Sequence, residues 1–457
     1  MFPINSEIRR YYWLDFSMQR IIAMPVVLIA ILYVMSVSGS AAGTIAGCFS
    51  ALFMVIVFIW GGYQAANAVI EEVRDNCWDN QRLSSVSPWQ LSLGKLFGST
   101  LYSWYGGIIT LLVYVFYRLN DQSPILVGYE VLLFIFCAII SHIIALICSI
   151  QSLRIQNRYG RFYPIAYLII GLMATSSLYN MSHDLSKSFE SDGAFTAVSW
   201  FNLDIDGGIF AITSLLLFLG WGMTGLIRLM REELKFTNIP WVWALFVLFI
   251  MIYTAGFHYD TTVHESYPES FYALHHNHFL KQYRLGIAFM FASASIYWMF
   301  FADIITITRY RMLCYQWHEK NWRKIGETIP RWMVSFVITI AAAVFFILFQ
   351  DTAKMGYSAI VLTSYILFIL RDAAIVHYFK FSSNNRRATM ATLFYYAILY
   401  MLLPAISFAV KPYYFSYVFY PVMTHDANIA MLLPVMVQLL AVGYLLYGRW
   451  IKGNQEI

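Results

Sequence analysis

The chain has 457 residues, of which 60% are hydrophobic and only 12% are charged, and its mean hydropathy is +0.61. A soluble domain carries about 25% charged residues, so this composition excludes a soluble globular protein and indicates a chain that lies in a lipid bilayer. The same numbers exclude an intrinsically disordered chain, because disorder goes with low hydrophobicity and high net charge.

The N-terminal part of the chain predicts two membrane spans. Charged residues between Glu7 and Arg20 precede an apolar run that has no small-residue cleavage site, so we expect a retained span and not a signal peptide. From Ile21 to Ile70 no residue is charged. Because a helix needs about 20 apolar residues to cross a bilayer, this stretch is long enough for two spans with a turn near residues 38–43.

Ten further apolar stretches follow along the chain. They lie near residues 96–117, 125–153, 162–181, 207–227, 240–259, 285–307, 332–350, 357–370, 391–410 and 429–447. The sequence therefore predicts an all-α polytopic membrane protein with twelve transmembrane helices.

The distribution of basic residues predicts the orientation of these spans. When the N-terminus is placed inside, 24 of the 30 Lys and Arg residues fall in the inner segments, and the bias alternates loop by loop. Cytoplasmic loops of membrane proteins carry this excess of Lys and Arg. We therefore expect both termini in the cytoplasm, and the net charge of +5 reflects topology and not nucleic-acid binding.

The twelve predicted spans fall into two similar halves, residues 1–227 and 228–457. Each half begins with a charged lead-in, has its longest charged inner loop after its second span, and ends with an aromatic-rich outer loop before its sixth span. Because six is an even number, both halves have the same orientation, and we expect two parallel six-helix repeats.

The inner loop at residues 71–98 contains the most informative pattern. A short polar helix is expected up to Leu83, and serines followed by Pro88 end this helix and begin another. The loop also holds Trp78 and Trp89, which a plain solvated loop does not need. We expect a helix–turn–helix at the cytoplasmic surface; an interfacial elbow anchored by tryptophans is the alternative.

This stretch resembles the permease subunits of ABC-2-type transporters. Those membrane domains carry an acidic residue, a run ending in Leu-Leu-Ser/Thr-x-Pro, and Gly-Lys-Leu at the start of the third span. Glu71–Glu72, residues 82–88 and Gly94–Leu96 stand in these places, whereas Asn76–Trp78 depart from the family pattern. The lead-in at residues 230–235 is similar to the elbow helix that begins such a permease half.

The resemblance implies a coupling role for the helix–turn–helix. In such permeases this element docks onto a separate cytoplasmic ATPase and transmits its closure to the spans, and a buried aromatic flanked by charges is a plausible interface hot spot. The rim charges would be Glu71, Glu72, Arg74, Asp75, Asp79 and Arg82, and the apolar contact would be Trp78, Leu83 and Pro88. In the second half the matching candidates are Trp317, Trp322 and Arg323, although this segment departs from the family pattern.

No nucleotide site is expected in the chain itself. Its only Gly-Lys pair, Gly94-Lys95, has Trp89 where a P-loop needs its first Gly and Leu96 where it needs Ser or Thr. We therefore expect no cofactor and no enzymatic activity in this chain, with ATP and Mg bound by a pair of partner ATPase subunits.

Several polar residues are candidates for a metal site or a substrate pathway. The outer segment at residues 258–284 is rich in histidines, and imidazole suits Zn²⁺ or Cu²⁺, but their spacing is irregular and no metal site is expected. The weak candidates there are His264, His275, His276 and His278.

Three ionisable residues inside predicted spans are candidates for a substrate pathway: His142, Glu130 and Asp303. Burying a charge at membrane depth is costly, so such residues usually have a function. Arg371 and Asp372 are expected to form a local structural pair.

The leading interpretation is the permease subunit of an ABC-2-like exporter in a plasma (bacterial inner) membrane. The first alternative is an ion-gradient-driven secondary transporter with twelve spans, which would need several carboxylates inside the membrane. The second is a membrane-embedded transferase that uses the histidine-rich outer loop.

In ABC-2-type permeases the outer loops hold short re-entrant helices, and the resemblance implies such helices near residues 200–204 and 413–421. Aromatic residues of an interface belt would give the same pattern.

Overall fold

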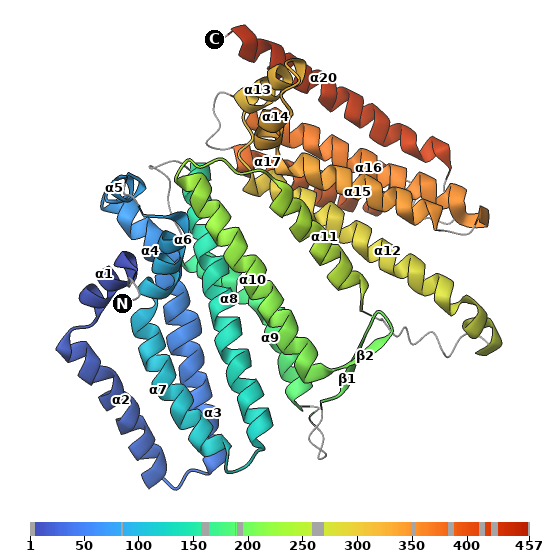
Figure 1. The fold of residues 1–457 in the computed structure, drawn as a ribbon. Coiled ribbons are helices and arrows are strands. Elements are labelled where there is room, and N and C mark those ends of the chain that lie inside the picture. The colour runs from blue at the N-terminus through green and yellow to red at the C-terminus, as the bar shows by residue number, and fades with distance from the viewer. Residues whose placement is uncertain are drawn as a thin grey trace. The chain divides into compact units, whose positions relative to one another are not determined.

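The computed structural model describes most of the chain. The described residues are 5–83, 86–156, 164–187, 189, 195–257, 269–349, 352–382, 388–410, 416–421 and 428–455. Within them, the side chains of residues 154–156, 269–282, 352–358, 408, 410, 416–417 and 452–455 are left aside. Almost all of the described part is helical (Figure 1).

The chain forms two compact units, Met1–Asn238 and Ile239–Ile457. The first unit contains the helices α1 (Ser6–Asp15), α2 (Met18–Val37), α3 (Ala42–Phe53), α4 (Gly62–Arg74), α5 (Trp78–Arg82), α6 (Pro88–Leu93), α7 (Leu101–Arg118), α8 (Pro124–Gln156), α9 (Pro164–Lys187) and α10 (Gly207–Glu233). The π-helical segments η1 (Met54–Gly61) and η2 (Gly94–Gly98) join α3 to α4 and follow α6.

The second unit has a similar order of elements. It contains α11 (Trp241–Ala255), α12 (Glu269–Ala302), α13 (Ile307–His318), α14 (Trp322–Thr328), α15 (Arg331–Leu348), α16 (Thr352–Lys380), α17 (Ala388–Ala397), the π-helical η5 (Ile398–Leu402), α18 (Leu403–Val410), α19 (Ser416–Phe419), the 3₁₀ segment η6 (Ile429–Leu432) and α20 (Leu433–Gln455). In both units two long helical segments precede a pair of short helices, and longer helices follow. The predicted boundary at residues 227/228, with six spans in each half, stays a prediction.

The helices have the length and composition of membrane spans. Within the described residues ten helices are long and apolar enough to cross a bilayer, or eleven when Pro88–Gly98 and Leu101–Arg118, bent by 53°, count as one span. The protein is therefore an all-α, multi-pass membrane protein. The predicted span that is missing from this count, residues 240–259, corresponds to α11, whose 15 residues fall short of the ~20 that a bilayer requires. The count of twelve and the orientation of the termini stay predictions.

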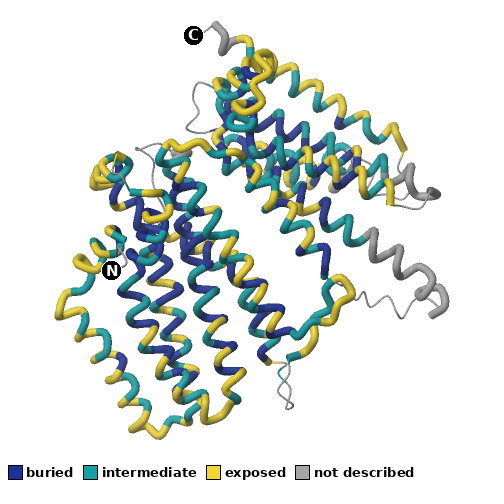
Figure 2. The backbone as a smooth tube through the Cα atoms, in the orientation of Figure 1, coloured by how far each residue is buried: buried dark blue, intermediate teal, exposed yellow. Residues whose placement is uncertain are grey.

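Each unit has its own core. In the first unit α8 packs against α4, α9 and α10, while α3 packs against α7. In the second unit α12 packs against α11 and α15, and α16 packs against α20. Buried residues gather on the facing sides of these helices, and the outward sides are exposed (Figure 2). Helix α2 is apolar on every side yet only 6% of its apolar window is buried, which is typical of a helix that faces lipid.

The described residues just before α10 form a β-hairpin. Strands β1 (Ala197–Trp200) and β2 (Leu203–Asp206) pair antiparallel, with Trp200 opposite Leu203. Phe201 and Asn202 form the turn, and both have positive φ values of 49° and 63°. The resemblance implied short re-entrant helices here, and this expectation is wrong because a two-residue turn with positive φ closes a hairpin. The corresponding region of the second unit contains the short helix α19.

Candidate functional site

The first helix pair, which we define as α5 and α6, lies between the end of α4 and the start of α7. Helix α4 ends at Arg74, and Asn76, two residues further on, has a positive φ of 58° and lies in the turn that leads into α5. Helix α6 begins at Pro88 after Ser87, whose side chain accepts a hydrogen bond from the Gln90 backbone N–H, while the Ser87 backbone N–H donates to Oε1 of the Gln90 side chain. This capping box gives the predicted helix start a physical cause.

A buried cluster of charges supports this helix pair from beneath. Lys95, in η2, is fully buried, and its ammonium donates a hydrogen bond to the carboxylate of Glu72 at the end of α4. The same carboxylate accepts from Arg10 of α1 and, over 2.9 Å, from Gln81 of α5. Glu7 lies 3.4 Å from the Lys95 ammonium. Three helices and the π-helical segment are therefore joined through one carboxylate.

Trp78 belongs to this interior and not to the surface. Its side chain is only 6% exposed and packs in an apolar cluster with Leu91, Leu96 and Met230. The Lys95 ammonium lies 5.9 Å from the centre of its ring, which is within the range of a cation–π interaction. Trp78 and Glu72 are both buried in this chain and support α5 from within; their predicted contact with a partner stays a prediction.

The remaining predicted residues lie at the surface. Leu83 is 86% exposed, although it is a large apolar side chain. The others are exposed or half-buried and lie at the end of α4, in α5 and at the start of α6: Glu71, Arg74, Asp75, Asp79, Arg82 and Pro88. Arg82 also donates a hydrogen bond over 3.1 Å to the Glu233 carbonyl, which attaches α5 to the end of α10. Trp89 at the start of α6 adds a second exposed apolar side chain.

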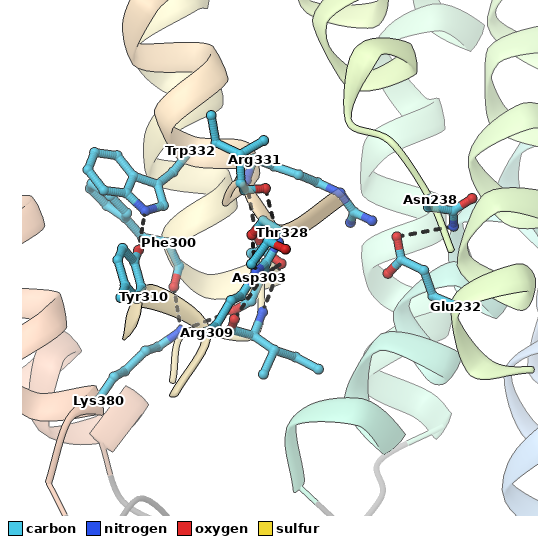
Figure 3. A network of polar contacts seen from close by, with 12 residues as sticks. Glu232, Asn238, Phe300, Asp303, Arg309, Tyr310, Thr328, Arg331, Trp332 and Lys380 are labelled. Carbon is cyan, nitrogen blue, oxygen red and sulfur yellow. Dashed lines mark hydrogen bonds and ion pairs between the residues drawn. The ribbon is translucent and has the colours of Figure 1, made fainter. Parts of the chain in front are cut away.

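In the second unit, α13 and α14 form a corresponding second helix pair, which Asp303 fixes at both ends. The Asp303 carboxylate accepts from Arg309 at the start of α13 and from the Arg331 backbone N–H at the start of α15, each over 3.0 Å (Figure 3). Arg309 also donates to the Thr328 carbonyl over 2.8 Å. Asp303 is therefore a buried carboxylate that joins α13 to α15, and its predicted place in a substrate pathway stays a prediction.

A chain of hydrogen bonds continues behind Asp303. The Trp332 indole N–H donates over 2.6 Å to the Tyr310 hydroxyl, which lies 2.6 Å from His377 Nε2. Because Nδ1 of His377 donates a hydrogen bond to the Ala373 carbonyl, Nε2 carries no proton and accepts a hydrogen bond from the Tyr310 hydroxyl. Burial raises the pKa of Tyr310. The inner end of α16 is thus hydrogen-bonded to the second helix pair.

The predicted contact residues of the second helix pair are all on its surface. Trp317 and Trp322 are 63% and 69% exposed, and their rings meet edge to face with centroids 5.7 Å apart. Arg323 is exposed beside them and lies 3.8 Å from Glu327. The structure therefore brings these three residues together at the tip where α13 turns into α14.

The other two pathway candidates are buried between helices. His142 in α8 is 1% exposed, and its Nε2 lies 2.8 Å from the Val57 carbonyl of η1, to which it donates a hydrogen bond. Glu130 accepts two hydrogen bonds from Arg118, over 3.0 and 3.2 Å, and one from Tyr114. His142 is thus hydrogen-bonded to the π-helical segment η1, and Glu130 is a paired carboxylate.

Arg371 and Asp372 form a fourth buried ionic site, which is larger than the local pair expected from the sequence. Arg371 and Asp372 are 1% and 0% exposed and lie well inside the candidate span Ala359–Lys380. The guanidinium donates to the Asp372 carboxylate over 2.8 and 3.0 Å, and to Gln438 of α20 over 2.7 Å. Tyr297 and Tyr400 donate to the other Asp372 oxygen over 2.8 and 2.5 Å. The signal was present, since opposite charges stood side by side in an apolar run, but the sequence did not show that they join four helices.

Three π-helical segments among the described residues lie beside these buried polar groups. Segment η1 supplies the carbonyl that His142 binds, η2 carries Lys95, and η5 carries Tyr400. Single-turn π-helices occur frequently at functional sites because they shift the helical register locally. This coincidence favours a functional role for the three polar clusters.

The weak metal candidates cannot be placed by their side chains. His264 lies outside the described residues, as do the side chains of His275, His276 and His278. Among the residues that are described, no group of three or more His, Cys, Asp or Glu side chains is arranged to hold a metal ion.

Comparisons with known proteins add no relatives to this picture. No protein-family model, no curated protein and no solved structure matches the chain. The resemblance to ABC-2-type permeases therefore rests on the residues quoted for it.

Proposed function

We propose that the chain is the membrane-spanning subunit of an ATP-driven transporter of the ABC-2 type, which works with a separate cytoplasmic ATPase, as an exporter. One observation supports it most: an exposed short helix pair between two long helical segments is fixed to them by the buried Lys95–Glu72 ion pair. Such an element transmits a push from a partner to the spans, because a fully buried ion pair resists local rearrangement.

In this proposal the residues of the first helix pair divide into two roles. Leu83 and the surrounding exposed charges contact the ATPase, with Leu83 as the apolar centre and the charges as the rim. Trp78, Glu72 and Lys95 are positioning residues that keep α5 at a fixed angle to α4 and α7. ATP and Mg bind to the partner, and the chain contributes the pathway between its helices.

Co-purification tests this assignment. The tagged chain is purified in a gentle detergent and incubated with a photoreactive ATP analogue, which labels any nucleotide-binding protein that accompanies it. A labelled partner is expected with the native chain and with Leu203→Asp, and is expected to be lost with Leu83→Asp. Leu203 is a matched control because it is also an exposed leucine, 61% against 86%, but lies on the outer hairpin.

The results have clear alternatives. If no labelled protein accompanies the native chain, the ATPase coupling is wrong. If both leucine variants retain the partner, a partner exists but the first helix pair does not bind it.

A second candidate is a transporter driven by an ion gradient, and one observation favours it. Asp372 is a fully buried carboxylate inside a candidate span, and ionisable groups at such depth often mark ion pathways. Proteoliposomes that contain a pH-sensitive dye would then show proton flux through the native chain and none through Asp372→Asn. Equal flux in both would exclude Asp372 from such a pathway.

A further inference from the structure

The second helix pair exposes four large apolar or aromatic side chains, which is unusual for short helices in water. Two of them, Met312 and Tyr315, lie three residues apart on one face of α13. The other two, Trp317 and Trp322, lie at the tip of the pair, where their rings meet edge to face. A surface of this composition is stable in contact with an apolar or interfacial environment.

Cations stand directly next to this apolar surface. Lys320, Arg323 and Lys324 are all exposed within the eight residues from Trp317 to Lys324. The stretch holds one carboxylate, Glu319, so its excess charge is positive. Tryptophan rings flanked by Lys and Arg are the composition with which proteins bind the headgroup region of anionic membranes.

The first helix pair is different in both respects. Its exposed residues at the end of α4 and in α5 are mainly polar, including Arg74, Asp75, Asn76 and Asn80. Leu83 and Trp89 are its large exposed apolar side chains, and they lie near the turn between α5 and α6. The two helix pairs therefore have different chemistry, although they occupy similar places in their units.

The anchoring at Asp303 keeps the second helix pair next to the bilayer. Only Asp303 to Thr306 separate the span that ends at Ala302 from α13, and α14 is followed within three residues by the span that begins at Arg331. The Asp303–Arg309 pair and the bond from Arg309 to the Thr328 carbonyl tie both short helices to these span ends. The apolar face is thus within reach of the headgroup layer.

We propose that the second helix pair binds the headgroup surface of an anionic lipid bilayer. Trp317 and Trp322 enter the interfacial layer, and Lys320, Arg323 and Lys324 contact the lipid phosphates. This contact depends on the adjoining helices being membrane spans and does not depend on the ATPase partner.

A cysteine at the right place allows a direct test. Cys314 is exposed in α13, three residues before Trp317, and Cys77 is exposed beside α5 in the first helix pair. An environment-sensitive fluorophore is attached to Cys314 in a chain whose other cysteines are replaced by serine. The protein is placed in nanodiscs of phosphatidylcholine alone or mixed with phosphatidylglycerol, each with a trace of lipid that carries a nitroxide quencher near its headgroup.

The proposal predicts blue-shifted, strongly quenched emission from Cys314 in the anionic discs and weaker quenching in the neutral discs. Each cation near an anionic surface contributes about a fivefold factor in affinity. Reversing all three charges, K320E with R323E and K324E, is therefore expected to make quenching in anionic discs as weak as in neutral discs, or weaker. The same label on Cys77 is the matched control and is expected to show the same weak quenching in both lipids.

A second variant separates a lost contact from a lost fold. W317A with W322A changes only exposed side chains, so its elution on size exclusion should be native while its quenching falls. If Cys314 is equally unquenched in both lipids, or if charge reversal leaves its quenching unchanged, the lipid contact is wrong and the tip is free to bind a protein.

Discussion

Lys95 and Glu72 form an ion pair beneath the first helix pair, although 23 residues separate them in the chain. The pair connects the helix that leads into the short helices with the one that leads out of them. It is almost completely removed from water, since Lys95 is fully buried and the Glu72 side chain is 9% exposed. Its removal should therefore affect the stability of the whole first unit.

Replacing Lys95 by Met is expected to destabilise the protein by up to about 3–5 kcal/mol, because it removes the buried cation and leaves the Glu72 carboxylate with only Arg10 and Gln81 as partners. The measurement is unfolding in detergent micelles, followed by intrinsic fluorescence. Lys187→Met is the matched control: Lys187 pairs with Asp184 over 3.0 Å, but its side chain is 64% exposed, and such surface pairs contribute at most about 1 kcal/mol. Equal losses in the two variants would contradict the role given to Lys95.

The Arg371–Asp372 pair predicts strong non-additivity. Arg371→Met should destabilise by about 3–5 kcal/mol, since it leaves a buried carboxylate without its cation, and Asp372→Leu should do the same to the guanidinium. The double variant leaves no uncompensated charge, so its loss should be clearly smaller than the sum of the two single losses. A double-mutant cycle on unfolding free energies measures this, and additive losses would show that the two charges are not coupled.

Tyr310 predicts an alkaline dependence of stability. Burial raises its pKa above the ordinary value of about 10, so the folded protein keeps a proton that the unfolded chain releases. The contribution of the protonated Tyr310 side chain to the free energy of unfolding is complete below about pH 10 and falls as the pH rises through and beyond that value. Tyr310→Phe should therefore lose less stability between pH 9 and pH 11 than the native chain, on the order of 1 kcal/mol less.

Tyr315, on the exposed side of the same helix, is the control for this experiment. Tyr315→Phe should follow the native pH profile of the unfolding midpoint. A Tyr310→Phe profile parallel to the native one would mean that the Tyr310 hydroxyl titrates as freely in the folded protein as in the unfolded chain.

Replacing Gly61 by alanine is expected to destabilise the protein. A Cβ at this position would lie 2.6 Å from Ser103 Oγ and 3.0 Å from His142 Nε2, so Gly61→Ala should cost about 1–3 kcal/mol by overpacking. Gly47 in α3 has open space around it. Because alanine is the better helix former, Gly47→Ala should leave stability unchanged or raise it by up to about 1 kcal/mol. The pair is compared by thermal unfolding, and a neutral Gly61→Ala would contradict the tight packing around His142.

That the apolar stretches are helices could be predicted because the physics that forms them is local, whereas boundaries such as that of α16 (Thr352–Lys380 against the predicted 357–370) differ by several residues. A span of about 20 apolar residues is forced into a helix by the absence of water in the bilayer, and Ser87 and Pro88 begin α6 by capping. The hairpin at Trp200–Leu203 was missed because its turn consists of Phe201 and Asn202 and lacks the glycine that usually marks such a turn.

The side on which a residue lies was harder to predict. Trp78 and Leu83 are five residues apart in one polar segment, yet one is buried and the other almost fully exposed. What decides this is the position of Lys95 and Leu91 in the next segment of the chain, which no local pattern contains. The four-helix network of Arg371 and Asp372 was missed for the same reason, since its tyrosines and glutamine come from three other helices.

The 53° bend between residues 88–98 and 101–118 has a mechanical consequence. The segment before the bend is about 16.5 Å long and the helix beyond it about 27 Å, at 1.5 Å per residue. If both arms turn together about residues 99–100, the far end of α7 sweeps an arc about 1.6 times as long as the one at Pro88. The elbow is then a lever that enlarges motion, so a displacement of a few ångströms at the short helices suffices to widen or narrow the opposite end of the bundle.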